Sequence, residues 1–216
     1  SAGIRVIDDL RGTTDLNGGT AGGTLASVTT TGAQNYNDAV VLTDDATLQS
    51  TGAGGITFQS TVSDDGSLVT NSNLIVNTAG ITTFNGIVGG GGNVLASVTT
   101  DAAGSTSVNA NITTSGAQHF GDSVVLTADV VATSTSSGSI SFDSTVNATV
   151  AGSQGLTINT SGSTTFTGVV GAVKALKSLA TDATGTTPLT APVYTPGPQP
   201  FGDAVNLTQN VQITST

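Results

Sequence analysis

The chain has 216 residues, a formal net charge of −10 and no cysteine. Only 8% of its residues are charged and 4% are aromatic, whereas about 25% of residues are charged in ordinary soluble proteins. Without cysteine there is no disulfide scaffold, and the negative charge disfavours phosphate backbones and anionic lipid headgroups. No apolar run approaches the roughly 18 residues of a membrane-spanning helix. We therefore expect no nucleic-acid partner and no membrane insertion.

Apolar residues alternate with polar ones in short bursts along the chain, and glycine, asparagine, aspartate, serine or threonine separates the bursts. A period of two with frequent breaks is typical of short strands that bury one face. Threonine, valine and isoleucine favour strands, and helix-forming stretches are missing. The sequence therefore predicts an all-β protein. The predicted inward-facing residues include Val40, Leu42, Ile56, Phe58, Val62, Leu74, Phe84, Val124, Leu126, Ile140, Phe142, Val146, Leu156 and Phe166.

An internal repeat extends over most of the chain. The segment GAQNYNDAVVL at 32–42 returns as GAQHFGDSVVL at 116–126 and as GPQPFGDAVNL at 197–207. Similarly, ITFQSTV at 56–62 returns as ISFDSTV at 140–146. One unit is about 82 residues long. The approximate predicted units are 1–31 (partial), 32–115, 116–196 and 197–216 (partial), all within one continuous domain spanning 1–216.

Two architectures fit this pattern. In a parallel β-solenoid, or β-helix, each unit would supply three to four coils of about 20 to 27 residues, stacked at about 4.8 Å. In the alternative, each unit would be a separate immunoglobulin-like sandwich of about seven strands. We favour the solenoid, because a thin interior suits valine, isoleucine, threonine and an occasional phenylalanine, whereas a sandwich needs bulkier packing.

Asp38, Asp122 and Asp203 recur at the same place in the three copies, on the parity that otherwise points inward. In a structural role, each carboxylate would cap backbone N–H groups at a corner of a coil. The alternative is a column of calcium ligands. The nonapeptide G-G-x-G-x-D of calcium-binding β-rolls is absent, so we predict the structural role and no cofactor. Further carboxylates for a calcium column would come from Asp44, Asp45 and Asp129.

A glutamine and an aromatic residue precede each of these aspartates. Repeating amides most often satisfy the backbone or one another, so we predict a structural role for them, with a row of sugar-binding amides as the alternative. These residues are Gln34, Gln118 and Gln199, and Tyr36, Phe120 and Phe201. His119 is the single histidine, and no cysteine or glutamate cluster accompanies it for a zinc site or a catalytic triad.

The segment GVVGAVKALKSLA at 168–180 has apolar residues at helical spacing. Its counterpart in the preceding unit, GIVGGGGNVLASV at 86–98, contains four consecutive glycines, which disfavour a helix. We therefore predict a loop that leads into a strand.

All five prolines fall in one window, at even-numbered positions between 188 and 200. In a parallel ladder alternate residues point their N–H groups to opposite neighbours, and proline belongs at strand edges. The window is therefore predicted to form an edge, a junction or a departure from the regular stack. The residues are Pro188, Pro192, Pro196, Pro198 and Pro200.

The pattern GAQ-x-[YF]-x-D-x-V-x-L, followed by I-x-F-x-S-T-V and TTF-x-G-x-VG, resembles the β-strand repeats of large bacterial exoproteins, the filamentous-haemagglutinin-like adhesins. The likeness covers residues 24–216. It implies a secreted or cell-surface, extracellular location, a right-handed β-helix, and a role in fibres, adhesion or a surface coat. No binding residue is carried over from it, because these repeats have no fixed site.

The sequence therefore predicts an extracellular structural protein of a bacterial surface, without catalysis, as a filament-forming subunit or an adhesin stalk. The expected partners are further copies joined end to end by self-assembly, or the continuation of a longer chain, with surface glycans as further candidates. One alternative is a carbohydrate-binding adhesion module, which would need an exposed row of aromatic residues, and only Tyr36, Tyr194 and six phenylalanines on mostly inward parity are available for it. The other is a β-helical polysaccharide-cleaving enzyme with a pair of aspartates.

Overall fold

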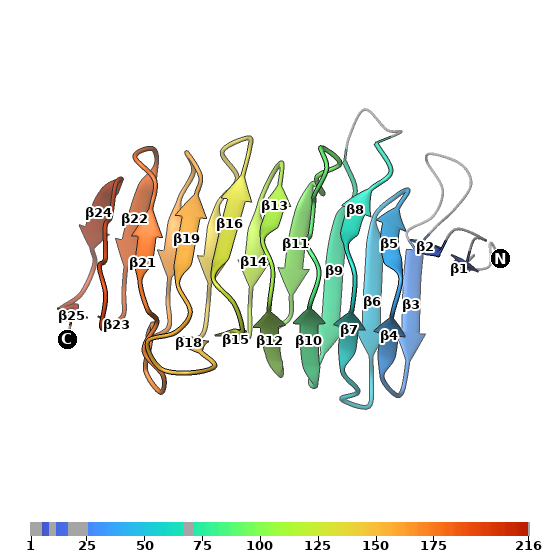
Figure 1. Ribbon diagram of the computed structural model, residues 1–216, viewed down its shortest axis with the longest axis horizontal. Coiled ribbons are helices and arrows are strands. Elements are labelled where there is room, and N and C mark those ends of the chain that lie inside the picture. Colours follow the sequence, from blue (N-terminus) through green and yellow to red (C-terminus); the bar gives the residue numbers. More distant parts are fainter. Residues whose placement is uncertain (1–5, 9–11, 17–25, 67–70, 216) are drawn as a thin grey trace.

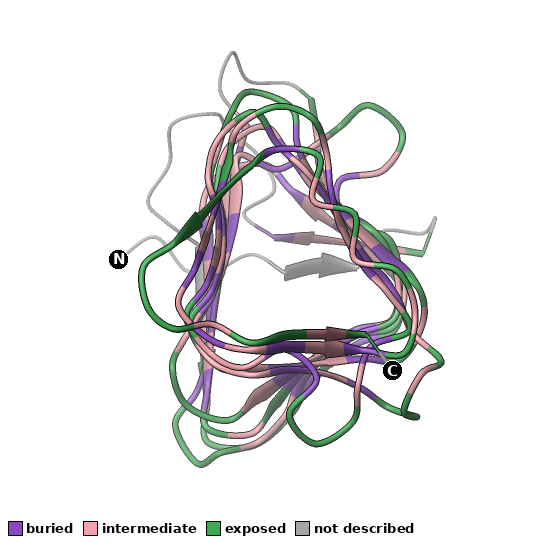
Figure 2. Cartoon of the chain, turned by 90° about the vertical axis from the view of Figure 1, so that its left-hand side faces the viewer, coloured by how far each residue is buried: buried purple, intermediate pink, exposed green. Residues whose placement is uncertain are grey.

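The computed structural model describes residues 6–8, 12–16, 26–66 and 71–215 of the chain. Short strands stack side by side into a long body (Figure 1) that is three-sided in cross-section (Figure 2). Within the described residues there is no helix, and every strand pair except β1 with β2 is parallel. This architecture confirms the predicted all-β parallel solenoid. It excludes tandem immunoglobulin-like sandwiches, because their sheets are antiparallel.

Three sheets form the three sides. Sheet I contains β3 (Ala26–Thr30), β6 (Ala46–Ser50), β9 (Asn73–Thr78), β11 (Ser97–Thr100), β14 (Gln118–Phe120), β17 (Ile140–Phe142), β20 (Thr164–Phe166), β22 (Thr186–Leu189) and β24 (Ala204–Leu207). Sheet II contains β4 (Gln34–Tyr36), β7 (Ile56–Phe58), β10 (Ile81–Phe84), β12 (Ser105–Val108), β15 (Ser123–Leu126), β18 (Val146–Ala148), β23 (Val193–Thr195) and β25 (Ile213–Ser215). Sheet III contains β1 (Val6–Asp8), β2 (Thr13–Leu16), β5 (Ala39–Leu42), β8 (Val62–Asp64), β13 (Ile112–Thr114), β16 (Val130–Ser134), β19 (Leu156–Asn159) and β21 (Leu179–Thr181).

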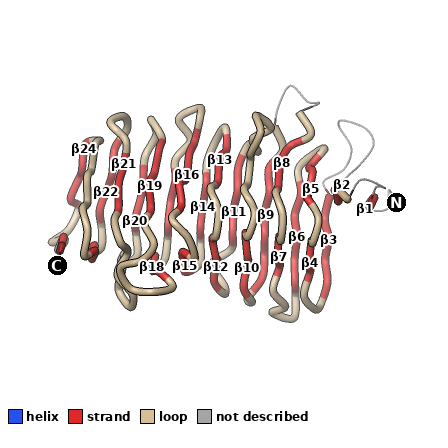
Figure 3. The backbone as a smooth tube through the Cα atoms, in the orientation of Figure 1, coloured by secondary structure: helices blue, strands red, loops and turns tan. Residues whose placement is uncertain are grey.

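The chain visits the sheets in the fixed order I, II, III, so three strand positions make one coil. Single bridges replace a strand at Val88 and at Phe201 in sheet III and at Val170 in sheet II. Coil length varies: Thr186 pairs with Ala204, 18 residues later, whereas Ala46 pairs with Leu74, 28 residues later. Corner loops absorb this variation, and some project from the stack, such as the loop after β18 (Figure 3).

The core is a narrow column of apolar side chains from the inward parity of all three sheets. Tyr36, Phe58 and Phe84 stack in sheet II with ring centroids 5.3 and 5.2 Å apart. Equivalent rings stack in sheet I at 5.1 Å spacing, from Phe120 through Phe142 to Phe166. These spacings slightly exceed the distance of about 4.8 Å between paired strands. The strand pairing of successive coils therefore holds the rings in contact.

Successive coils come very close together at some corners. A Cβ atom on Gly138 would overlap the backbone of Gly116 and Ala117 in the preceding coil. The equivalent Gly54 has the same relation to the backbone of Gly32. Glycine is needed at these positions because it has no Cβ.

The repeat unit does not contain a whole number of coils. From β4 to β14 the chain passes eleven strand positions, including the bridge at Val88, and eleven positions on three sides make 11/3, or three and two-thirds, coils. The next unit, from β14 to the bridge at Phe201, again has eleven. Equivalent residues therefore move to another side in each copy. Gln34 lies in sheet II and Gln118 in sheet I, and the third copy reaches sheet III at Phe201.

Strand β1 departs from the predicted continuous parallel stack. Val6 pairs with Leu16 in an antiparallel register. Only four residues, 9–12, connect β1 to β2, which suffices for a hairpin, whereas a parallel connection here takes a whole coil. Much of the partial unit 1–31 lies outside the described residues.

The window at 188–200 was predicted to be an edge, a junction or a departure from the regular stack. At Pro188 it is not a sheet edge, although the register between β20 and β22 consists of the single pair Phe166 with Leu189. Pro188 lies inside β22, and β22 pairs with β20 on one side and β24 on the other. The carbonyls of Pro192, Pro198 and Pro200 also accept backbone hydrogen bonds from the preceding coil. Proline is tolerated because a carbonyl can still be paired where the N–H is missing. Strand structure is nevertheless reduced between Pro196 and Pro200, where the copies with Gln34–Tyr36 and Gln118–Phe120 have full strands.

Candidate functional site

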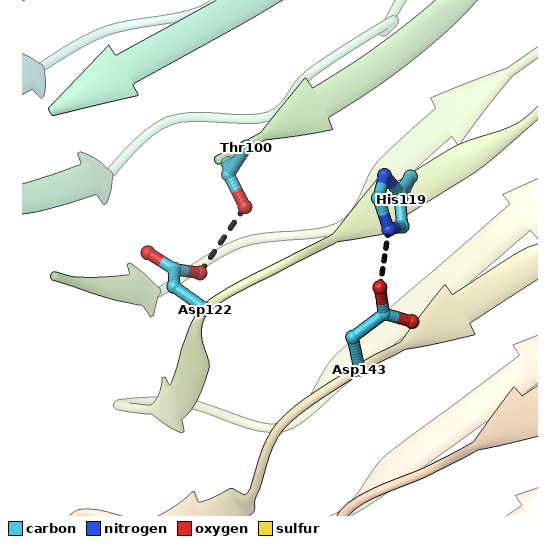
Figure 4. A network of polar contacts seen from close by, with 4 residues as sticks. All are labelled: Thr100, His119, Asp122 and Asp143. Atoms are coloured by element: carbon cyan, nitrogen blue, oxygen red, sulfur yellow. Dashed lines mark hydrogen bonds and ion pairs between the residues drawn. The ribbon is translucent and has the colours of Figure 1, made fainter. Parts of the chain in front are cut away.

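The carboxylate of Asp122 lies buried at the corner between β14 and β15, with 2% of its surface exposed. It accepts a hydrogen bond from Thr100 Oγ1 at 3.1 Å (Figure 4). It also accepts hydrogen bonds from Thr106 Oγ1 at 2.8 and 3.0 Å. Both threonines belong to the preceding coil. The carboxylate therefore ties two coils together through side-chain hydroxyls, where capping of backbone N–H groups was predicted.

The same arrangement recurs 81 residues later at Asp203. Its carboxylate accepts hydrogen bonds from Thr181 Oγ1 at 2.7 Å and from Thr187 Oγ1 at 2.9 and 2.7 Å. Asp203 lies between the Phe201 bridge of sheet III and β24 of sheet I, so this second copy of the network occupies a different corner. Asp38, in the first copy, is exposed at the third corner, between β4 and β5.

This placement is incompatible with a calcium column built from Asp38, Asp122 and Asp203, because a column requires its ligands on one line along the axis. The proposed helper carboxylates have other partners. Asp45 Oδ1 accepts the backbone N–H and the side-chain amide of Asn73, each at 2.8 Å. Asp129 accepts Gly155 N and Lys177 Nζ, and Asp44 accepts the N–H of Asp45. Among the described residues, no three histidine or acidic side chains lie together as a metal site would require.

Burial and hydrogen bonding shift three pKa values. Desolvation raises the pKa of Asp122, although the hydroxyls of Thr106 and Thr100 act in the opposite direction. Burial raises the pKa of Tyr36 to about 12. The Gly155 N–H, together with the Lys177 ammonium, lowers the pKa of Asp129. The carboxylate of Asp122 is thus held in an environment that favours its neutral form, as desolvation of a charged group predicts.

The three repeated glutamines make equivalent side-chain hydrogen bonds, each at its own corner of the solenoid. Gln34 Nε2 donates to Thr30 Oγ1 at 3.2 Å in its own coil and to the carbonyl of Gln49 at 2.8 Å in the next coil. Gln118 Nε2 makes the equivalent bonds to Thr114 Oγ1 and Thr133 O, and Gln199 Nε2 makes them to Thr195 Oγ1 and Thr214 O. Because each glutamine lies at a different corner, the three cannot form a single sugar-binding row.

One difference among the copies concerns the amide oxygen. Tyr36 Oη donates to Gln34 Oε1 at 2.9 Å. Phenylalanine occupies the tyrosine position in the other copies, at Phe120 and Phe201. Within the described residues, the buried oxygens Gln118 Oε1 and Gln199 Oε1 have no hydrogen-bond partner.

The remaining candidates lie on the outside of the stack. His119 Nε2 lies 2.7 Å from Asp143 Oδ2, and both side chains are nearly half exposed (Figure 4). Tyr194 is half-buried on β23, and its Oη lies 3.4 Å from Gln212 Oε1. The segment 168–180 is a loop leading into β21, as predicted, and it carries Lys174 and Lys177.

The sequence reasoning missed two structural roles. Asp64 is 1% exposed, and its carboxylate accepts hydrogen bonds from Gly66 N and Ser72 N at 2.7 Å each. The threonine partners of the buried aspartates were also overlooked. A signal for them exists in the repeat, because the segments at 98–108 and 179–189 keep threonine at the positions of Thr100 and Thr106.

The fold defines the protein as a parallel β-solenoid that is built from a long repeat. Buried side-chain hydrogen bonds at the corners join its successive coils. Comparison of the chain with protein-family models, curated proteins and solved structures gave no match. Within the described residues, no helix is long and apolar enough to cross a membrane.

Proposed function

We propose that the chain is an extracellular structural element of a bacterial surface, a stalk or fibre segment that extends and holds rather than binds or converts a small molecule. The observation that supports this proposal is where the residues common to the three repeat copies lie in the fold. These common residues form the apolar core and the hydrogen bonds that join coils at the corners. Leu126 and Gln118, for example, are both buried. Selection of a stable stack accounts for residues kept at such positions.

Outward positions of the same segment differ among copies. The position between glutamine and aromatic is Asn35, His119 or Pro200, and the position before the final leucine is Val41, Val125 or Asn206. A ligand site repeated with the unit would keep its outward side chains instead. The resemblance to filamentous-haemagglutinin-like repeats supports the same role and an extracellular location.

Small-angle X-ray scattering and electron microscopy of the purified chain test the structural part of the proposal. The nine coils in the described part of the chain, at about 4.8 Å each, give a rigid body about 43 Å long, without flexible joints between units. A glycan array and incubation with acidic polysaccharides test the alternatives. Binding that Tyr194→Ala abolishes, or turnover by the chain itself, would contradict the proposed role.

A further inference from the structure

The network around Asp122 has a further buried threonine beside it. Thr82 lies opposite Thr106 in the register of β10 and β12, on the side away from Asp122, and both threonines are on the inward parity of their strands. Thr82 is 1% exposed, and its Oγ1 has no hydrogen-bond partner in the described part of the chain. Buried polar atoms nearly always have a partner in the protein, an ordered water or an ion. The Thr82 hydroxyl therefore indicates a bound group beside the network.

The network around Asp203 has the same feature at the equivalent position of the repeat. Thr164 is 1% exposed, and its Oγ1 likewise lacks a partner among the residues that the structure describes. The bridge between Ser163 and Thr186 places Thr164 opposite Thr187, which donates to Asp203. Because the two networks lie at different corners, the unpartnered hydroxyl belongs to the repeat unit and does not depend on one packing environment.

Neither buried aspartate has a basic partner within the described stack. The ion pairs that form there, with His119 and with Lys177, involve other carboxylates. Desolvation raises the pKa of Asp122, and the charge of Asp101 acts in the same direction. An ionised carboxylate that is buried without a cationic partner is unfavourable. Each corner thus combines an uncompensated negative charge with an unpartnered hydroxyl.

We propose that each corner binds one alkali-metal cation, sodium or potassium, between the aspartate–threonine network and the unpartnered threonine hydroxyl. The available ligands are oxygen atoms only, which hard cations prefer. Thr106 Oγ1 donates its hydrogen to Asp122, so its lone pairs and those of Thr82 Oγ1 remain available to a cation. One carboxylate balances one positive charge, whereas a calcium site combines several charged ligands. The inference concerns the interior of the solenoid and does not rest on the proposed structural role.

Thermal unfolding in matched salts tests the two sites. At about pH 8, well above the ordinary pKa of a carboxyl group, sodium chloride or potassium chloride should raise the unfolding midpoint by at least about 2 °C over choline chloride at the same concentration. The reason is that a ligand that binds only the folded chain stabilises it. Choline screens surface charge equally but is too large for a buried corner. Equal midpoints in all three salts would overturn the proposal.

Variants assign the effect to particular atoms. Thr82→Val combined with Thr164→Val keeps the shape of both side chains and breaks no hydrogen bond of theirs. We expect this double variant to be as stable as wild type in choline chloride and to lose most of the gain in sodium or potassium chloride. Thr83→Val, on the outward side of β10, is the control and should keep the full gain.

The carboxylates are tested by Asp122→Asn combined with Asp203→Asn. This variant should show no gain from either alkali-metal salt, with circular dichroism showing that it is folded. A gain that persists in it would place the cation elsewhere and overturn the proposal.

Sodium NMR gives a readout that does not depend on stability. Exchange with the corners should broaden the sodium line of the wild-type solution, potassium should compete, and the aspartate double variant should leave the line narrow. Equal line widths for the two proteins would mean that water completes the networks, and would overturn the proposal. Stabilisation by calcium chloride that exceeds that by the alkali-metal salts at equal ionic strength, and that the aspartate substitutions remove, would overturn the monovalent assignment.

Discussion

Asp122 and Asp203 occupy the same place in the repeat and accept hydrogen bonds from equivalent threonine pairs, yet they lie at different corners of the solenoid. This network of one aspartate and two threonines is thus a property of the repeat unit, and it forms at whichever corner of the solenoid the unit places it.

Removing a threonine hydroxyl from this tie should destabilise the stack. Thr106→Val keeps the shape of the side chain but leaves the buried Asp122 carboxylate with one hydroxyl partner, so we expect a loss of about 1–3 kcal/mol in the free energy of unfolding. Thr187→Val should cost a similar amount at the other corner. Urea unfolding measures both. The control Thr83→Val, on the outward side of β10, should change stability by less than about 0.5 kcal/mol.

The raised pKa of Asp122 predicts a definite pH dependence. A folded-state pKa above the unfolded value means that the folded protein favours the protonated carboxyl. Its contribution to stability is therefore complete below the unfolded pKa and is lost as the pH rises through the folded pKa. Asp122→Asn cannot ionise, so it lacks this loss.

The measurement compares urea unfolding of wild type and Asp122→Asn from about pH 3 to about pH 7. Other titrating groups cancel in the difference between the two proteins. Wild type should lose stability relative to Asp122→Asn as the pH rises. A relative gain would contradict the assigned direction. Asp38→Asn, which removes a carboxylate at the exposed equivalent position, serves as the matched control.

Gly138→Ala should be strongly destabilising, because its methyl group would overlap the backbone of Gly116 in the preceding coil. The coils would have to separate at that corner, at a cost of about 3 kcal/mol. Gly54→Ala should behave alike at another corner. Gly32→Ala is the control, since no atom lies within 4 Å of its added Cβ. Thermal unfolding that ranks Gly32→Ala with Gly138→Ala would show that the coils are not packed this closely.

Moving the tyrosine hydroxyl from one repeat copy to another tests whether its hydrogen bond to the glutamine amide oxygen contributes to stability. Tyr36→Phe removes the donor to Gln34 Oε1 and should cost about 1 kcal/mol. Phe120→Tyr should supply the missing donor to Gln118 Oε1 and leave stability unchanged or higher. Chemical denaturation of both variants decides the matter. A marked loss with Phe120→Tyr would mean that the hydroxyl does not reach the amide.

Much of the architecture could be predicted from the sequence. Period-two patterning identified the inward residues, and Phe58, Phe84 and Phe142 are indeed buried, because one buried face dictates alternation. The repeat also identified the glutamine and aspartate corners. How equivalent residues are distributed around the axis could not be predicted, since it depends on the number of strand positions per unit. That number includes the bridge at Val88, where no strand forms.

The same dependence on three-dimensional neighbours explains the places of Pro188 and Asp64. Pro188 lies in an interior strand because the lost N–H matters only if a partner is required there, which the sequence does not reveal. Asp64 is buried, and its carboxylate accepts the N–H of Ser72, eight residues further along the chain. Neither relationship has a local signature.

A unit of three and two-thirds coils also has a consequence for growth by duplication. Any outward side chain acquired before the block is copied will point in three directions in three consecutive copies, and it returns to its first direction after eleven coils. Tandem duplication alone therefore yields a shaft with the same features all round. A one-sided adhesive strip would require separate changes in individual copies.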